Sequence, residues 1–353
     1  MDTGNHLSLT APHLERLLAA FERLDGSRIL LTGGTGFVGK WMLQTAKIAQ
    51  ANSQSKIELV IPTRQLSAQH VQSAIAIGCP NVSWVEGDFL NSALDLGHID
   101  IIIHAATPAS AQLNTENPAE MLRINVEAME SVLRYASDNK PLLFTSSGAI
   151  YGTQPQSVSH IAEGEFEPEP PTNQLNAYAQ GKQIAEKLCR EAGRSGQCSP
   201  IIARLFAFGG EYLPRDTHFA IGNFIQNVLD RQPIAIQGDG RARRSYLYGA
   251  DMATWLWCAI AHSGGKNTGP FHIGSENSVS ILELAQTVAT VSGEVLNYIP
   301  EITIAKAIDT SEPIHQYVPA NSGTRKALQV SEWTSLEDCI SKMFLDGTKT
   351  VRE

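Results

Sequence analysis

The chain has 353 residues, of which 42% are hydrophobic and 18% are charged, and its formal net charge is −9. This is the composition of a globular protein with a sizeable core, and the acidic balance argues against nucleic acid or an anionic membrane as the main partner. No apolar run approaches the ~18 residues that cross a bilayer, and the N-terminus lacks a signal-peptide pattern, so we expect a cytoplasmic protein without a membrane partner.

The cysteines argue against a disulfide framework and against a metal site. Their scattered positions contain no CxxC pair and no metal-ligand spacing, and we therefore expect reduced thiols and no bound metal. The five positions are Cys79, Cys189, Cys198, Cys258 and Cys339.

The first 200 residues alternate short apolar runs with helical periods, after a short extra helix predicted at 13–24. Strands are predicted at 28–32, 57–63, 82–86, 99–104, 142–146 and 199–204, and helices at 36–50, 67–77, 118–139 and 176–192. This alternation predicts an α/β fold with a Rossmann-type, doubly wound parallel sheet.

The alternation weakens after Arg204, where helices are predicted at 219–231, 251–262, 281–292 and 332–344. We therefore expect an N-terminal extension (1–26), a Rossmann domain (27–205) and a smaller mixed α/β lobe for the substrate (206–353), whose chain can cross back to the sheet. The proline- and glutamate-rich stretch 153–174 is predicted to be a long loop, and loops of this length are usually either functional or mobile.

A glycine turn, TGGTGFVG, follows the first predicted strand and opens a helix. Such a turn presents bare backbone and unpaired helix N–H groups to a pyrophosphate, so it predicts a dinucleotide site. Its candidate cofactor residues are Gly33, Thr35, Gly36, Phe37, Val38 and Gly39.

The end of the second predicted strand bears on the choice of dinucleotide. NAD sites usually place a carboxylate there, whereas this strand ends in Thr63 and Arg64. A guanidinium suits a 2′-phosphate, so NADP(H) is favoured and NAD(H) stays possible, while a merely solvated arginine is the alternative. After the third strand, Asp88 and Phe89 are candidates for the adenine end, or form a plain strand-end turn.

Tyr178 and Lys182 stand four residues apart, on one face of a predicted helix. A nearby ammonium and a cationic nicotinamide ring would lower the pKa of the phenol, which then exchanges a proton with a carbinol as hydride moves. Ser147, at the end of a buried strand, is positioned to bind the same substrate oxygen, although strand-end capping is the alternative for Ser146 and Ser147.

These features resemble the extended short-chain dehydrogenase/reductase family of nucleotide-sugar epimerases, dehydratases and reductases, which serve cell-surface polysaccharide biosynthesis. The resemblance covers about residues 28–330, and five motifs stand in the family's order: TGGTGFVG, HAA (104–106), SSGAIYG (146–152), YAQGK and GDGRARRSYLYGAD (238–251).

The resemblance implies a catalytic triad of Ser147, Tyr178 and Lys182, and a C-terminal lobe that binds a nucleoside diphosphate sugar. Arg244 and, more weakly, Asn223 would bind the substrate, and Ser147 would contact the sugar. Members typically form homodimers through the helices matching 118–139 and 176–192. Further cofactor contacts would come from Ala105, Ala106, Thr107, Asn125, Ser146, Tyr178 and Lys182.

The chain departs from the family pattern at three places. Gly148 and Ala149 stand where 4,6-dehydratases and decarboxylases place a carboxylate, and Ala207 stands where an asparagine is expected near the diphosphate. The third departure is the missing acidic residue after the second strand.

The leading hypothesis is hydride transfer at the sugar C4, most simply by a 4-keto-sugar reductase that uses NADPH. A 4-epimerase comes next, followed by a 4,6-dehydratase that recruits Glu163 or Glu165 from the long loop. A hypothesis of another class is a catalytically inactive, cofactor-sensing protein.

Overall fold

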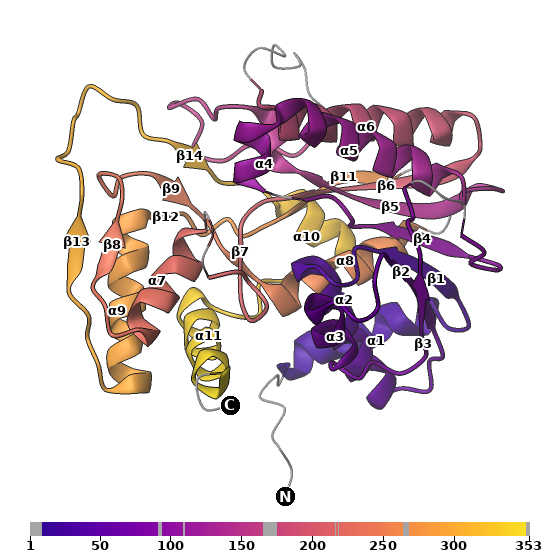
Figure 1. Cartoon of the computed structure of the whole chain (residues 1–353), viewed down its shortest axis with the longest axis horizontal. Coiled ribbons are helices and arrows are strands. Elements are labelled where there is room, and N and C mark those ends of the chain that lie inside the picture. Colours follow the sequence, from indigo (N-terminus) through magenta and orange to yellow (C-terminus); the bar gives the residue numbers. More distant parts are fainter. Residues whose placement is uncertain are drawn as a thin grey trace, which may run out of the picture.

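Figure 1 shows the computed structural model of the chain, which describes residues 9–90, 94–108, 110–164, 175–215, 217, 219–263 and 268–350. A seven-stranded sheet in the order β11-β6-β5-β4-β1-β2-β3 forms its centre, and every neighbouring pair of strands is parallel. The predicted Rossmann-type sheet is confirmed. Its strands are β1 (Arg28–Thr32), β2 (Glu58–Thr63), β3 (Val82–Glu86), β4 (Ile101–His104), β5 (Lys140–Ser147), β6 (Cys198–Leu205) and β11 (Thr268–Ile273).

The strands at the centre of the sheet are buried on both faces, and apolar side chains follow one another along them without a polar alternation, whereas the edge strand β3 is only partly buried. Successive residues point to opposite faces, so Ile29 and Leu31 join one hydrophobic cluster while Leu30 joins the other. The two clusters are the two layers between the sheet and its covering helices.

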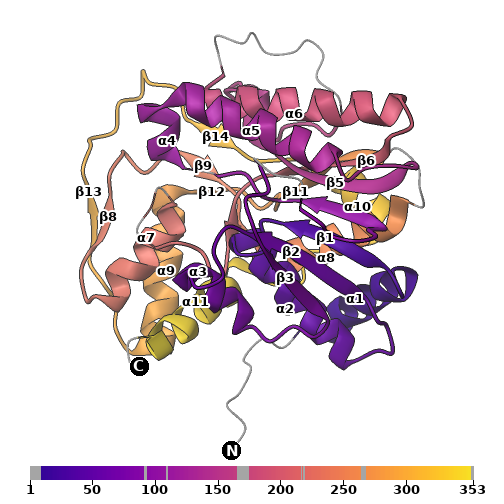
Figure 2. The same ribbon diagram turned by 45° about the vertical axis from the view of Figure 1, so that its right-hand side comes forward.

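Helices cover both faces of the sheet, as the views in Figures 1 and 2 show. On one face lie α5 (Pro118–Leu133) and α6 (Ala177–Arg194), and on the other lie α2 (Phe37–Ala51) and α8 (Gly249–Ser263). The extra helix α1 (Ala11–Arg23) packs against α8 and α2 and buries Leu17 and Phe21. Three short helices also belong to the part of the molecule around the central sheet: α3 (Gln69–Ile75), α4 (Ala111–Glu116) and α10 (Ser322–Leu328).

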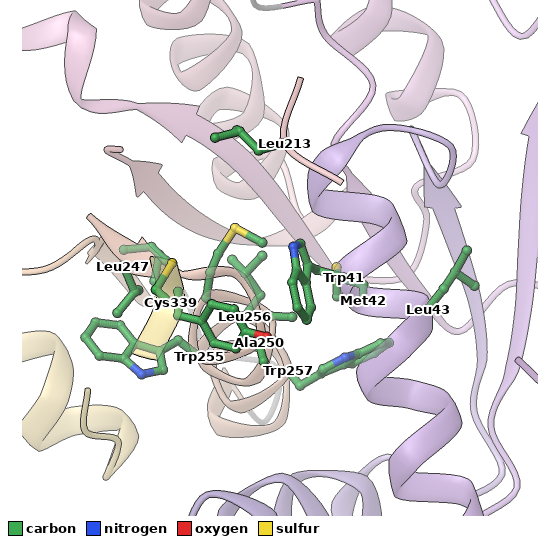
Figure 3. Packing of buried hydrophobic residues seen from close by; sticks show 14 of the residues in the cluster. Trp41, Met42, Leu43, Leu213, Leu247, Ala250, Trp255, Leu256, Trp257 and Cys339 are labelled. Atoms are coloured by element: carbon green, nitrogen blue, oxygen red, sulfur yellow. The ribbon is translucent and has the colours of Figure 1, made fainter. Parts of the chain in front are cut away.

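Tryptophans dominate the core between α2 and α8. Figure 3 shows Trp41 and Trp257 in this layer, and both rings are fully buried. Their indole N–H groups donate to Glu211 O and Thr45 Oγ1, both at 3.0 Å. The layer therefore buries large apolar surface without leaving these donors unsatisfied.

The chain after β6 forms a smaller lobe and also returns to the sheet through α8, β11 and α10. The lobe carries three small sheets, ordered β10-β7, β12-β9-β14 and β13-β8. Its elements are β7 (Phe208–Gly209), α7 (Ala220–Leu229), β8 (Ile234–Ile236), β9 (Arg243–Arg244), β10 (Leu247–Tyr248), β12 (Val279–Ser280), α9 (Ile281–Leu296), β13 (Ile302–Ile304), β14 (Gln316–Tyr317) and α11 (Leu336–Thr350).

Two helix ends differ from the sequence predictions for local reasons. The helix predicted at 118–139 ends at Leu133, and the left-handed backbone angles of Asp138 and Asn139 (φ 56° and 57°) in the turn before β5 would not allow it to reach 139. The helix predicted at 332–344 begins only at Leu336, because Asp251 holds the backbone N–H groups of Trp333 and Thr334 at 2.9 and 3.1 Å.

Two classes of site are not found in the described part of the chain. Over those residues, none of the helices combines the length and apolarity needed to pass through a bilayer. Within the same ranges, His, Cys, Asp and Glu side chains do not gather in groups of three or more that would suit a metal ion.

Candidate active site

The glycine turn lies at the carboxyl end of β1, beside the point where the strand order reverses between β1 and β4. Gly33 has φ 75°, and a Cβ there would lie 2.4 Å from Ala105 O. A Cβ on Gly39 would lie 2.3 Å from Gly33 O. Only glycine fits at either position, as the close approach of turn, helix and strand requires.

Helix α2 begins directly after this turn, with Gly36 as its N-cap residue. The amides of Phe37, Val38 and Gly39 belong to its first turn, where N–H groups have no partner within the helix. A Cβ on Gly36 would meet only Gly33 O at 3.5 Å, so the space beside this residue is open. The turn, with Thr35 in it, thus has the geometry of a pyrophosphate cradle.

The other predicted cofactor residues line the same carboxyl edge of the sheet. Thr63 ends β2 and is nearly buried, and Arg64 after it is exposed. Asp88 follows β3, where its Oδ1 accepts from Leu90 N at 3.0 Å, and Phe89 stacks on Tyr135. Ala105, Ala106 and Thr107 follow β4 directly.

Buried polar atoms in this region fit a bound dinucleotide. Ser146 Oγ and Asn125 Oδ1 have no hydrogen-bond partner among the described residues, although both side chains are buried. Such atoms are rare in folded proteins and call for a ligand or water. Together with the glycine cradle, they make the site suited to a nicotinamide dinucleotide.

Ser147, Tyr178 and Lys182 come together beside the cradle. Ser147 ends β5, while Tyr178 and Lys182 lie one turn apart on α6. Lys182 Nζ lies 5.7 Å from the centroid of the Tyr178 ring, and the Ser147 side chain is near enough to lower the pKa of the Tyr178 phenol. Helix α6 is fixed at this place by its N-cap Asn176 and by Asn114 Oδ1, which accepts from Tyr178 N at 2.9 Å.

Lys182 is 2% exposed and is held by oxygen acceptors. Its Nζ donates to Thr145 O at 2.7 Å and to Thr107 Oγ1. Burial lowers the pKa of Lys182 to about 7, and the Glu186 carboxylate one turn further along α6 partly opposes this shift. The ammonium is therefore easily lost near neutral pH.

The expectation that Lys182 and a cationic nicotinamide ring together lower the pKa of Tyr178 stays a prediction, because it concerns the protein with its cofactor bound. Burial raises the pKa of Tyr178 above its ordinary value, and the Ser147 side chain opposes that rise only in part. The phenol is thus protonated at neutral pH. It stands ready to give a proton to a bound oxygen rather than to take one.

An ion pair between Arg204 and Glu186 connects β6 to α6, the helix that carries Tyr178 and Lys182. Arg204 on β6 donates to both carboxylate oxygens of Glu186, at 3.0 and 2.8 Å, and to Tyr151 Oη at 2.7 Å. Tyr151 belongs to η1 (Gly148–Tyr151), the turn that directly follows Ser147, and its hydroxyl also lies 2.6 Å from His272 Nε2. The spacing of motifs gave no signal for this network.

Of the carboxylates expected as possible replacements for the missing acid, Glu163 is engaged elsewhere. Ala149 lies in η1, and Glu163 accepts from the N–H groups of Gly323 and Thr324 at 2.6 and 2.7 Å at the start of α10. Glu165 lies outside the described residues.

Among three neighbouring arginines of the lobe, Arg244 differs from the other two. Arg241 pairs with Asp239 at 2.5 Å, and Arg243 lies 3.6 Å from Glu283. Within the described ranges, Arg244 has no carboxylate partner and donates only to the carbonyls of Arg243 and His315, at 2.8 and 3.4 Å. Its guanidinium is therefore the one suited to bind an anionic ligand.

The structure does not join Asn223 to this region. Asn223 lies on α7, which packs against α9, α11 and β8, and no described contact links its half-buried side chain to the Ser147 cluster. In contrast, Tyr317 of β14 reaches the cluster and was not predicted. The Ser147 side chain is near enough to lower the pKa of the Tyr317 phenol, and Tyr317 stands in register with Arg244 of β9.

The sequence of the chain matches that of the NAD dependent epimerase/dehydratase family over residues 29–274. The chain belongs to this family. This confirms the resemblance to the extended short-chain dehydrogenase/reductases that the motifs predicted.

Similar proteins include nucleotide-sugar enzymes from several organisms. UDP-glucuronic acid decarboxylase 1 of Arabidopsis thaliana is 27% identical over 90% of this chain and 69% of its own length. UDP-glucuronic acid decarboxylase 3 of the same plant is 28% identical over 87% of this chain and 84% of its own length.

Solved structures confirm the fold. An epimerase from Methanothermobacter thermautotrophicus has a TM-score of 0.76 at 20% identity and covers 95% of this chain and 96% of its own. UDP-glucuronic acid 4-epimerase from Bacillus cereus, in complex with UDP-glucuronic acid and NAD, has a TM-score of 0.72 at 21% identity. This alignment covers 92% of this chain and 99% of the epimerase.

Proposed function

We propose that the chain reduces a 4-keto nucleotide sugar, with NADPH as the hydride donor. The single observation that carries this proposal is the position of Tyr178 beside Lys182 on α6, next to a turn shaped for a dinucleotide. A phenol that keeps its proton is the acid that carbonyl reduction needs.

Each residue of the triad has a separate role in the proposed reduction. When bound, the cofactor supplies the hydride that reaches C4 of the sugar. The Tyr178 hydroxyl donates its proton to the C4 oxygen, and the Ser147 hydroxyl holds that oxygen in place. Lys182, already bonded to Thr107 and Thr145, would offer a further N–H to the ribose hydroxyls of a bound cofactor.

Elimination of water or loss of carbon dioxide is disfavoured by position 149. Family members that carry out these reactions place a carboxylate there, whereas this chain has Ala149 and holds Glu163 in contacts with α10. The similarity to decarboxylases therefore favours a nucleoside diphosphate sugar as the ligand of this chain, but it does not favour decarboxylation as its reaction.

The second candidate is a 4-epimerase, because the same phenol could return a proton that it first removed. Assays that add UDP-, dTDP-, CDP- or GDP-linked 4-keto-6-deoxy sugars and follow NADPH absorbance separate the two candidates. Stoichiometric NADPH oxidation is expected. Interconversion of an unmodified nucleotide sugar at C4 without cofactor consumption would identify the epimerase. Release of carbon dioxide from UDP-glucuronic acid would contradict the argument from Ala149, and inertness with bound cofactor would favour a sensing protein.

NADP(H) is the cofactor we propose, although solved relatives contain NAD. Arg64 is exposed after β2 and makes no hydrogen bond or ion pair with the other described residues, and no carboxylate ends that strand. Arg64→Ala should weaken NADPH binding about 10-fold and leave NADH binding within twofold, since only the 2′-phosphate is lost as a partner. Fluorescence titration with both cofactors measures this difference. Equal losses would show that the arginine is only solvated.

We also propose a cytoplasmic homodimer that forms through α5 and α6. Ile184 supports this surface, because it lies on α6 and is 38% exposed. Sedimentation analysis of the intact chain tests the dimer.

A further inference from the structure

The backbone of Tyr178 is held by a side chain from outside its own helix. Helix α6 begins at Ala177, so Tyr178 is its second residue. A backbone N–H group in the first turn of a helix has no carbonyl partner within that helix. The N–H group of Tyr178 instead donates to Asn114 Oδ1 at 2.9 Å. Because helix ends fray, the position of the Tyr178 phenol depends in part on this contact.

The cap of α6 does not supply this bond itself. Its N-cap residue, Asn176, uses its side-chain oxygen to accept from Ala179 N at 2.9 Å. A backbone N–H group only donates, so the contact with Tyr178 needs an oxygen acceptor from another element. Asn114 provides that acceptor.

Asn114 is a half-buried residue of the short helix α4, which has defined ends. At its start, Ser110 Oγ accepts from Leu113 N at 3.1 Å, and at its end Asn117 N donates to Leu113 O at 2.9 Å. Helix α4 packs against α5, on the face of the sheet that α6 also covers (Figures 1 and 2). The acceptor is therefore held in place before any ligand binds.

The chain between β4 and α5 contacts both catalytic residues of α6. Thr107, which precedes α4, accepts from Lys182 Nζ through its hydroxyl, and Asn114 accepts from Tyr178 N. Thr107 is also one of the predicted cofactor contacts that follow β4. Two hydrogen bonds thus join the predicted nicotinamide side of the site to the first two turns of α6.

We propose that Asn114 is a positioning residue that holds the first turn of α6 so that Tyr178 faces the substrate oxygen. Proton transfer requires the two heavy atoms to lie within about 2.6–3.2 Å, so a small displacement of this turn lowers the rate. Asn114 acts through the backbone of Tyr178 and not on the reacting atoms. The effect on turnover rests on the proposed function, whereas the effect on the position of Tyr178 does not.

Two substitutions of similar volume at Asn114 test the proposal in the intact chain with a 4-keto nucleotide sugar. Asn114→Leu removes the acceptor and should lower kcat about 3- to 10-fold, the effect of one neutral hydrogen bond, with KM for NADPH unchanged. Asn114→Asp keeps an oxygen at the same place, and its charge suits a helix N-terminus, so kcat should stay within about twofold of the wild type. Equal losses would overturn the proposal and indicate that the Asn114 amide N–H groups contact the sugar. An Asn114→Leu variant with wild-type kcat would reduce the contact to packing.

A double-mutant cycle and a control on the same helix complete the kinetic test. In the Tyr178→Phe background, Asn114→Leu should lower the residual turnover less than about twofold, because Asn114 acts through Tyr178. The control is Gln112→Leu, at an exposed residue whose side chain donates to Glu116 at 3.1 and 3.2 Å. It should leave kcat unchanged, and a loss equal to that of Asn114→Leu would contradict a specific role of Asn114.

Measurements without turnover separate this proposal from the proposed function. In Asn114→Leu the amide hydrogen of Tyr178 should exchange at least about threefold faster, because its hydrogen bond is lost. The ¹³Cζ resonance of the Tyr178 ring, assigned with Tyr178→Phe, should move in Asn114→Leu but not in Gln112→Leu. Both changes in a protein inert towards every sugar would refute the reductase alone. An unmoved ring resonance would refute the positioning role of Asn114, whether or not the protein is active.

Discussion

Two buried polar clusters of this chain contain similar residue types but differ in whether their hydrogen-bonding groups are satisfied. Between α1 and α8, His13 Nε2 lies 2.7 Å from Thr254 Oγ1, and its Nδ1 lies 3.5 Å from Asp251 Oδ1. At the carboxyl edge of the sheet, Ser146 Oγ and Asn125 Oδ1 have no partner among the residues that the structure describes. We call the first the closed cluster, because its hydrogen-bonding groups have partners, and the second the open cluster, because some of its groups have none among the described residues.

The difference shows why geometry alone does not identify an active site. The closed cluster has the hydroxyl–imidazole–carboxylate order of a hydrolase triad. However, His13, Thr254 and Asp251 are 0–1% exposed, and the His13 ring stacks on Trp333 at 4.3 Å. Asp251 also accepts from the backbone N–H groups of Trp333 and Thr334, so the polar groups of this cluster are satisfied within the fold and stabilise it. The open cluster retains unused hydrogen-bonding capacity beside a glycine cradle, as a ligand site should.

The largest expected effect is in the open cluster. Tyr178→Phe should lower turnover by roughly 10²- to 10⁴-fold, because a positioned acid is removed, while cofactor affinity and the unfolding midpoint stay near those of the wild type. Steady-state kinetics and thermal denaturation measure both parts. Turnover near that of the wild type would remove Tyr178 from the mechanism.

Arg244→Ala should have the next largest effect, and it tests whether the ligand site of the open cluster continues into the lobe. Loss of a charged hydrogen-bond donor should weaken nucleoside diphosphate binding by about 10- to 150-fold. Calorimetric titration with UDP, dTDP, CDP and GDP is the measurement. Arg241→Ala is the matched control, since Arg241 already pairs with Asp239, and similar losses in both variants would contradict the assignment.

In the closed cluster the change should affect stability instead of catalysis. His13→Ala removes buried packing and leaves Thr254 and Asp251 short of a partner, so we expect a loss of about 2 kcal/mol in the free energy of unfolding, or roughly 30-fold in the folding equilibrium. Glu15→Ala, on the exposed side of the same helix, is the control. Denaturant unfolding measures the stability of each variant, and activity assays at low temperature measure its turnover. A His13→Ala variant that lost turnover but kept its stability would contradict this distinction between the two clusters.

The two clusters also differ in how far the sequence predicts them. The glycine turn and the Tyr178–Lys182 spacing follow long periodic elements, and β1 and β3 have the predicted ends. Tyr317 could not be found in this way, because β14 has two residues and shows no periodicity, and the triad residues near it lie far away in the chain. The partners of His13 likewise depend on tertiary packing of the extra helix, which no local pattern encodes.

The smallest expected effect is a pH dependence of the open cluster. Lys182 has a pKa lowered to about 7, so its ammonium is present below that pH and is lost as the pH rises. The pKa of Tyr178 is raised, and its acid form therefore persists through the same range. If the ammonium is needed to bind and orient the ribose, kcat/KM should fall above pH 7 and approach tenfold per pH unit. Circular dichroism at each pH would show that the fold is intact, and a profile that stays flat two units above neutrality would mean that neutral Lys182 suffices.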